Sequence, residues 1–106
     1  MRYFFAEISI LDINSEQRRY LRAQAHHLNP VVMIGDAGLS EGVVNEIERS
    51  LASHELLKIK VQSGDKAARE SLLADICARL DAAPVQHIGK TLVIYKPAEK
   101  PKLVLP

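Results

Sequence analysis

Apolar positions recur at two spacings along the chain, and the changes between them mark seven elements. Spacings of three and four residues predict amphipathic helices, whereas strict alternation or a short β-branched run predicts strands. Asn14 with Gln17, Ser40 and Asp65 can each cap a helix start. The predicted elements are helices over 14–28, 41–54 and 66 to about 80, and strands over 31–34, 57–61, 83–88 and 91–95.

The strand over 57–61 indicates how the sheet is covered. It alternates strictly, with large aliphatic residues on one face and Lys58 and Lys60 on the other. One sheet face must therefore stay partly in water. Gly89-Lys90 is a two-residue turn typical of an antiparallel hairpin. We predict an α/β fold of order αβαβαββ: a small mixed four-stranded sheet whose second and third helices cover one face, as a sandwich rather than a doubly wound fold.

Length and composition are those of an ordinary single domain. The chain has 106 residues, 47% hydrophobic and 25% charged, which is enough to bury a core without disulfides or metal. Cys77 is the single cysteine and lies at helical spacing, so we expect it in the core, in a reducing cytoplasm.

The ends of the chain are predicted separately from the domain. No apolar run reaches the roughly 18–20 residues of a membrane span, and Glu7 interrupts the apolar N-terminus, so we predict a cytoplasmic protein without an export signal. The expected organisation is an N-terminal extension over 1–13, a folded domain over 14–97 and an extended, partly mobile, basic and Pro-rich tail over 98–106.

The formal net charge of +1 hides a segregation of charge along the chain. Segments 14–34, 57–64 and 82–106 hold nine basic and two acidic residues, whereas 35–56 and 65–81 hold nine acidic and four basic residues. If the first helix, the strands and the tail share one side of the fold, that side is a basic face suited to a phosphate backbone. The alternative is that the charges intermix in space and are simply solvated.

A glycine loop, Gly35-Asp36-Ala37-Gly38, joins the first predicted strand to the second helix. Glycines on both sides of the turn allow φ > 0 and close approach of a ligand, and a helix start presents free N–H groups at the positive end of its dipole. Such a loop can hold a phosphate, as the Gly-x-x-Gly loop of KH-type RNA-binding domains does. The alternative is an ordinary tight turn, because two glycines at this spacing occur often by chance.

The first predicted helix carries a row of basic side chains at i, i+4 spacing, Arg18, Arg22 and His26. This row is suited to phosphates, or it is an ordinary solvated helix face. The buried stripe of the same helix is predicted to comprise Tyr20, Leu21, Gln24, Ala25 and Leu28.

The sequence lacks the usual motifs of catalysis and metal binding. His26 and His27 diverge by about 100° around a helix, and the remaining His and Cys residues lie on separate predicted elements. No Ser or Cys lies in a nucleophile elbow, and the glycine loop lacks the Gly-Lys-Ser/Thr ending of a P-loop. We predict a non-enzymatic binding protein with no cofactor, metal, small-molecule substrate or membrane partner.

Longer stretches carry a more specific signal than the glycine loop. They include Arg19-Tyr20-Leu21-Arg22-Ala23, Pro30-Val31-Val32, Gly38 to Val43, His54 to Val61 and Leu92 to Pro97. Over 14–97 these stretches resemble, in register, the CRM (chloroplast RNA splicing and ribosome maturation) domain, and specifically the stand-alone bacterial YhbY family. The resemblance implies a fold like the C-terminal domain of translation initiation factor 3, RNA binding through the glycine loop and adjoining basic surface, and association with precursors of the large ribosomal subunit.

Three positions depart from the family pattern. Asp36 places a carboxylate in the loop, where it would repel a phosphate unless it turns aside to cap the following helix. Asn29 stands where lysine is common, and Lys96 replaces a frequent arginine, which keeps the charge but loses the bidentate fork. These departures predict a modest affinity for RNA.

Together the residues and the resemblance predict an RNA-binding ribosome-assembly factor that docks on ribosomal RNA of large-subunit precursors, with ribosomal proteins as further candidate partners. The alternatives are a module that docks on a ribosomal protein and a DNA-binding domain. Base stacking is expected to be minor, with Tyr95 at a sheet edge as a candidate. The predicted RNA-contacting residues are Gly35, Asp36, Ala37, Gly38, Arg18, Arg19, Arg22, His26, Lys58, Lys60, Lys90 and Lys96.

Overall fold

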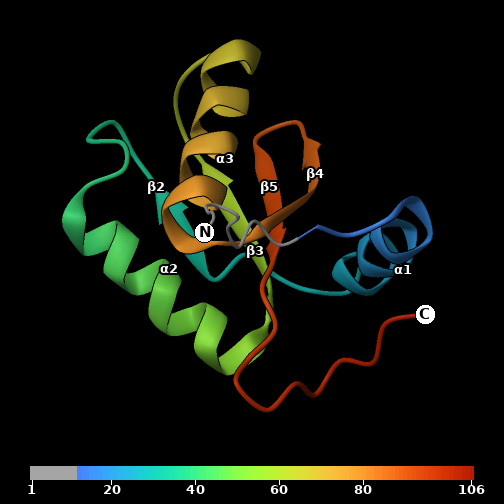
Figure 1. Cartoon of the computed structure of the whole chain (residues 1–106). Helices are drawn as coiled ribbons and strands as arrows, with labels where there is room; N and C mark the ends of the chain where they lie inside the picture. The colour runs from blue at the N-terminus through green and yellow to red at the C-terminus, as the bar shows by residue number, and fades with distance from the viewer. Residues whose placement is uncertain (1–11) are drawn as a thin grey trace, which may run out of the picture.

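Three helices and four strands follow one another in the predicted order (Figure 1). The computed structural model describes residues 12–106, so most of the predicted extension over 1–13 lies outside the described residues. The elements are α1 (Ser15–Ala25), β2 (Val32–Ile34), α2 (Glu41–His54), β3 (Leu56–Val61), α3 (Lys66–Leu80), β4 (Ala83–Ile88) and β5 (Thr91–Tyr95). The predicted α/β class and the order αβαβαββ are confirmed.

The three helix starts lie where the capping residues place them. The Asn14 side chain accepts from the Gln17 N–H, and the Gln17 side chain accepts from the Asn14 N–H, which completes a capping box. Ser40 and Asp65 cap α2 and α3 in the same position. None of the helices within residues 12–106 is long and apolar enough to cross a membrane.

Helix α1 ends three residues earlier than predicted. It stops at Ala25, and a turn follows in which the Leu28 N–H donates to the Ala25 carbonyl oxygen at 2.9 Å. Leu28, which the predicted stripe placed in the core, is consequently exposed, and Gln24 is exposed within the helix itself. The turn redirects the chain toward β2 ahead of Pro30, which disfavours helical backbone at the preceding residue.

The four strands form one mixed sheet in the order β2-β3-β5-β4. Strand β2 runs parallel to β3, and β5 pairs antiparallel with both β3 and β4. The predicted hairpin is confirmed, and Gly89 takes φ +56° in its turn, a conformation that glycine adopts without strain. Strand β5 is therefore interior, and β2 and β4 are the two edges.

Helices α2 and α3 pack on the same sheet face, as predicted (Figure 1). Ile47 and Leu51 of α2, and Ile76 and Leu80 of α3, are buried there against the aliphatic side chains of the strands. Cys77 is buried in the same cluster, and this burial raises the pKa of its thiol to about 11. The larger of the two cores lies between these helices and the sheet.

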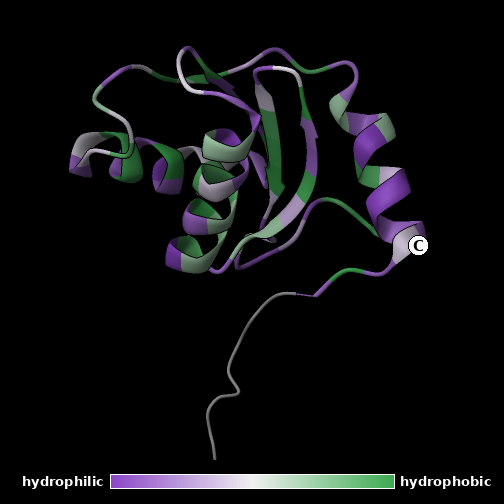
Figure 2. Cartoon of the chain, turned by 90° about the horizontal axis from the view of Figure 1, so that it is seen from above, coloured by the Kyte–Doolittle hydropathy of each residue, from purple (hydrophilic) through white to green (hydrophobic). Residues whose placement is uncertain are grey.

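Helix α1 packs on the opposite face, so the sheet has helices on both sides (Figure 2). Leu21 and Ala25 pack in one buried cluster with side chains of the sheet, namely Leu56, Ala83, Val85, Val93 and Tyr95. Ile13, assigned by prediction to the extension, is buried in this second core. The predicted coverage of one face by α2 and α3 is confirmed, and the apolar stripe of α1 covers part of the other face.

The last residues are not the loosely extended tail of the prediction. Leu103 and Leu105 pack against the second core, and the Gln17 side chain donates to the Pro106 carbonyl oxygen at 3.2 Å. Glu55, 2% exposed, accepts backbone N–H groups of the tail through its carboxylate. This buried carboxylate fastens residues 98–106, hereafter the tail, to the body of the fold.

Candidate nucleic-acid interface

The glycine loop is a tight turn closed by the Gly38 N–H, which donates to the Gly35 carbonyl oxygen at 3.0 Å. Gly38 has φ +70°, and a Cβ at this position would meet nothing within 4 Å. Its backbone is therefore open to a ligand and favours glycine. Gly35 does not adopt a positive φ, so the prediction that both glycines bend the chain in this way is wrong at Gly35.

The start of α2 carries carboxylates as well as free N–H groups. Ser40 caps the helix by accepting from the Val43 N–H at 3.3 Å, so the suggestion that Asp36 caps it is wrong. Asp36 is exposed in the loop, and Glu41 lies in the first helical turn. These two carboxylates oppose the attraction of the helix dipole for a phosphate.

A cleft of about 180 Å³ separates the glycine loop from the start of α3 and includes a cation that the prediction missed. Arg69 lines this cleft together with Gly35, Gly38 and Gly64. Its guanidinium donates through Nη1 to the Gly64 carbonyl oxygen at 2.7 Å and through Nε to His87 Nε2 at 3.3 Å. Arg69 lies in an acidic segment of the sequence and comes close to the glycine loop only because β2 pairs in parallel with β3. No local sequence pattern therefore indicates that Arg69 belongs to this site.

Lys60 and Lys90 lie at the same end of the sheet as the glycine loop. Ile34, the last residue of β2, pairs with Val61. The Val61 N–H in turn donates to the Lys90 carbonyl oxygen at 2.8 Å, so the β4–β5 turn lies beside the end of β3. The structure therefore brings together the loop and these two predicted lysines.

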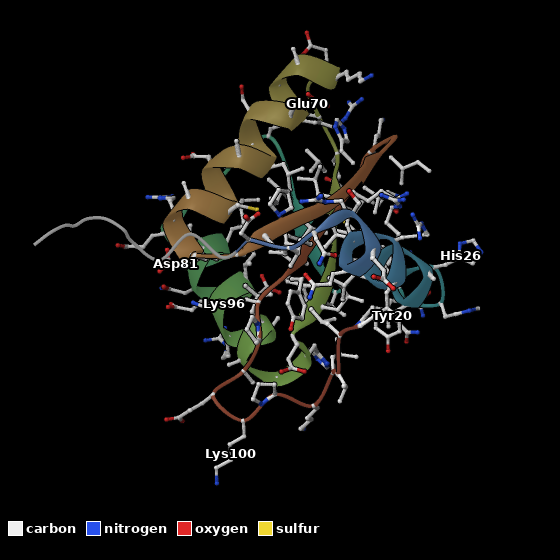
Figure 3. The ribbon with its side chains drawn as sticks, turned by 45° about the vertical axis from the view of Figure 1, so that its right-hand side comes forward. Tyr20, His26, Glu70, Asp81, Lys96 and Lys100 are labelled. Carbon is white, nitrogen blue, oxygen red and sulfur yellow. The ribbon has the colours of Figure 1, made fainter. Side chains whose placement is uncertain are left out.

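The basic row of α1 lies away from the glycine loop, on the other face of the sheet. Tyr20 packs with Leu103 and Leu105 of the tail. At 3.6 residues per turn, Arg18, Arg22 and His26 fall on the side of α1 roughly opposite to Tyr20; Figure 3 shows Tyr20 toward the tail and His26 away from it. Arg18 Nε donates to the Pro84 carbonyl oxygen of β4 at 3.2 Å.

This row borders a part of the sheet that α1 leaves uncovered, which we call the open sheet face. Its side chains project on the α1 side of the sheet, between α1 and the end that carries the glycine loop. They form two rows across the strands: Met33, Lys60, Thr91 and Ile88 in one, and Lys58 and Gln86 in the other, on either side of Val93, which is buried with α1 in the second core. Lys58 also joins this face to α1, because its Nζ donates to the Leu28 carbonyl oxygen at 3.0 Å.

Two predicted contact residues remain. Arg19 is exposed on the outer side of α1, about 20° around the helix from His26. Lys96 follows β5 at the opposite end of the sheet from the loop, where its N–H donates to the Glu55 carbonyl oxygen at 2.9 Å. Its side chain lines a hollow with Glu48 and Leu51 of α2, and Figure 3 shows it on the far side of the sheet from His26.

Tyr95 is not available for base stacking. It lies in the interior strand β5 rather than at a sheet edge, and it is 3% exposed. Burial, together with the negative charge of Glu55, raises the pKa of its phenol. The suggestion that Tyr95 contacts bases is therefore wrong, because the position of β5 in the sheet cannot be deduced from its own alternation.

The charge segregation along the chain is reproduced in space only in part. The basic row of α1, together with Lys58 and Lys60, lies on one face of the sheet. The helices α2 and α3, which cover the other face, carry five carboxylates and four basic side chains, so that face is nearly neutral rather than acidic. Lys96 also lies there.

Within residues 12–106, no group of three or more His, Cys, Asp or Glu side chains is arranged to hold a metal ion. His87, the most enclosed histidine of this region, accepts from Arg69 Nε through Nε2, which leaves Nδ1 as the donor to Glu70 Oε2 at 3.3 Å. These contacts link the β4–β5 hairpin to α3 and suit a structural role.

Comparison with known proteins agrees with this architecture. A chain of Haemophilus influenzae named an RNA-binding protein is 46% identical over 94 residues, which cover 89% of this chain and 95% of the relative. A chain of Pseudomonas aeruginosa named a probable RNA-binding protein is 38% identical over 89 residues, covering 84% and 86%. The solution structure of a hypothetical Staphylococcus aureus protein, described as a candidate RNA-binding protein, superposes with a TM-score of 0.80 at 30% identity and covers 90% of this chain and 100% of that one.

The family model for the CRS1/YhbY (CRM) domain matches residues 13–96, which span every helix and strand described above. The prediction of a non-enzymatic protein agrees with these relatives, which are named for RNA binding. The resemblance stated from sequence is thus confirmed, and the chain belongs to the CRS1/YhbY (CRM) domain family.

Proposed function

We propose that this protein binds ribosomal RNA in precursors of the large ribosomal subunit and acts in their assembly in the cytoplasm. The observation that carries the proposal is the basic row of α1 beside Lys58 and Lys60, on the sheet face opposite α2 and α3. The names of the relatives support RNA as the polymer. The ribosomal target rests on the family resemblance.

Phosphate contacts are assigned mainly to the basic row. Arg22 and His26 are exposed, and Arg18 is held against β4 by its bond to Pro84. Successive members of the row are about 6 Å apart along the helix axis, from the 1.5 Å rise per residue. The row therefore offers positive charge at intervals along a line, which suits a phosphate backbone rather than a single compact anion.

The glycine loop has a second and weaker role in this proposal. Gly38 lets a backbone approach closely, and Arg69, Lys60 and Lys90 lie at that end of the sheet. Asp36 reduces the local positive potential. RNA that follows the basic row across the sheet would reach the glycine loop at the far end of the sheet. There the close approach that Gly38 permits would contribute more to binding than charge does.

Salt titration tests the backbone contacts. Affinity for ribosomal RNA is expected to fall steeply with salt, and Arg22→Ala is expected to reduce the slope of log K against log [salt] by about 0.7–0.9, the loss of one phosphate contact. Arg49→Ala is the matched control, because Arg49 is an exposed arginine of α2, on the other side of the sheet. Equal effects of the two substitutions would contradict the assignment.

Two further measurements separate the alternatives. A DNA-binding domain would bind DNA of matched sequence as tightly as RNA. A module that docks on a ribosomal protein would show little dependence on salt. Crosslinking in cells, followed by sequencing of the attached RNA, is expected to recover large-subunit precursor RNA; recovery at background level would defeat the proposed function.

A further inference from the structure

The open sheet face carries more exposed apolar surface than phosphate binding requires. Leu28, Val31, Met33 and Ile88 are 38%, 50%, 54% and 60% exposed. They are four of the five large exposed hydrophobic residues within 12–106, and each lies on or beside this face. A phosphate gains nothing from contact with such groups, so the basic row does not explain them.

These apolar groups lie beside two lysines, one in each row. Met33 at one edge and Ile88 at the other close the row whose middle members are Lys60 and Thr91. The second row contributes Lys58 and Gln86. No carboxylate belongs to either row. The face is therefore complementary to a polyanion that also offers flat apolar surfaces.

Nucleic acid with unpaired bases has this combination of properties. Inside a duplex the base faces are stacked on one another, so a protein meets only phosphates, sugars and base edges. Unpaired bases expose both faces, which stack on apolar or aromatic side chains at little cost in sequence preference. Aliphatic side chains such as Met33 and Ile88 provide the same kind of apolar contact with less area than an aromatic ring.

A cleft adjoins the open sheet face beside β2, on the side of α1 that faces the tail. Its volume is about 370 Å³, and Leu28, Val31 and Lys58 line it together with the tail residue Leu103. Gln24 and Asn29 contribute side-chain amides to its rim, groups that can pair with the edge of a base. Apolar walls with a few polar groups are typical of sites for small planar ligands.

We propose that the open sheet face binds unpaired nucleotides of the RNA, with bases against Met33, Ile88 and the cleft at Val31, and phosphates along the basic row of α1. This inference rests on the proposed function and specifies the class of RNA: single-stranded segments or loops rather than uninterrupted duplex. The bases supply apolar contact that is independent of salt, whereas the phosphates supply the salt-dependent part.

The test compares a hairpin RNA that has an unpaired loop with a blunt RNA duplex formed from the same strand and its complement. The wild-type protein is expected to prefer the hairpin. The double substitution Met33→Thr with Ile88→Thr preserves charge and strand propensity, and it is expected to weaken hairpin binding roughly tenfold without changing the salt slope. Val104→Thr is the control, because Val104 is 82% exposed in the tail.

The exchange variant Met33→Ile with Ile88→Met keeps both positions apolar and is expected to retain wild-type affinity. Equal affinity of the wild-type protein for hairpin and duplex would overturn the inference. Unchanged hairpin binding by the threonine variant would also overturn it, and would indicate that the exposed apolar side chains bind a protein partner instead. Failure of the proposed function is distinct, because neither RNA would then bind in a salt-dependent manner.

Discussion

Glu55 is expected to contribute more to stability than any other charged side chain of the described residues. It follows α2 as its C-cap residue, and its carboxylate accepts the N–H groups of Ala98 at 2.8 Å, Leu103 at 2.9 Å and Lys102 at 3.1 and 3.2 Å. The substitution Glu55→Gln keeps the shape of the side chain and removes its charge. It therefore isolates the contribution of the carboxylate.

The magnitude follows from these contacts. Glutamine retains one acceptor oxygen and turns an NH₂ group toward the other donors, so the N–H of Ala98 or Leu103 loses its acceptor. A buried donor left unsatisfied costs about 1–3 kcal/mol, and the remaining bonds weaken because their acceptor is no longer charged. We expect Glu55→Gln to lower the free energy of unfolding by about 2–4 kcal/mol.

Urea denaturation and amide hydrogen exchange measure this effect. The substitution is expected to lower the urea midpoint and to reduce protection at the Ala98 and Leu103 amides more than in the sheet. Glu46→Gln on the exposed side of α2 is the control and is expected to change stability by less than about 0.5 kcal/mol. If Glu55→Gln shifted stability no more than the control and left the tail amides protected, the proposed anchoring would be refuted.

Three further predictions concern acid, the glycine loop and the cysteine. Burial alone would raise the pKa of Glu55, but the N–H donors outweigh burial and hold the pKa below its ordinary value of 4.5. The ionised carboxylate therefore stabilises the fold above pH 4.5, and this stabilisation is expected to be lost as the pH falls through the lowered pKa. Glu55→Gln is expected to make acid unfolding curves flatter in this range. Gly38→Ala is expected to cost about 1–2 kcal/mol in urea unfolding because of its φ of +70°, whereas Gly42→Ala within α2 is expected to stabilise by about 0.5–1 kcal/mol. The Cys77 thiol, buried and with its pKa raised to about 11, is expected to resist alkylation in the native protein and to react on unfolding; rapid native labelling would contradict its burial.

Local signals explain which features could be predicted from the sequence. Each helix start depends on a cap within three residues, as at Asn14, and the β4–β5 hairpin depends on the turn at Gly89. These interactions are complete within a few residues, so the pattern of side chains contains them. The common face of Lys58 and Lys60 was predictable for a related reason, because it follows from the alternation within a single strand.

Long-range contacts explain what could not be predicted. The insertion of β5 between β3 and β4 buries Tyr95 and moves Lys96 away from the glycine loop. The bond between Glu55 and the Ala98 N–H joins residues 43 positions apart. Glu55 was counted from sequence as an ordinary acidic residue, although it holds the tail. The site was predictable as separate parts, but the distance between the basic row and the loop depends on how α1 crosses the sheet.

The basic row, Lys58 and Lys60 concentrate positive charge on one face of a protein that is nearly neutral as a whole. Far from a polyanion such a molecule is attracted weakly, yet close to one the local field orients it so that this face approaches first. Once bound, it turns α2 and α3 outward, where five carboxylates and four basic side chains nearly balance and offer little attraction to a second strand. Each copy would thus bind one stretch of the polymer without crosslinking two stretches.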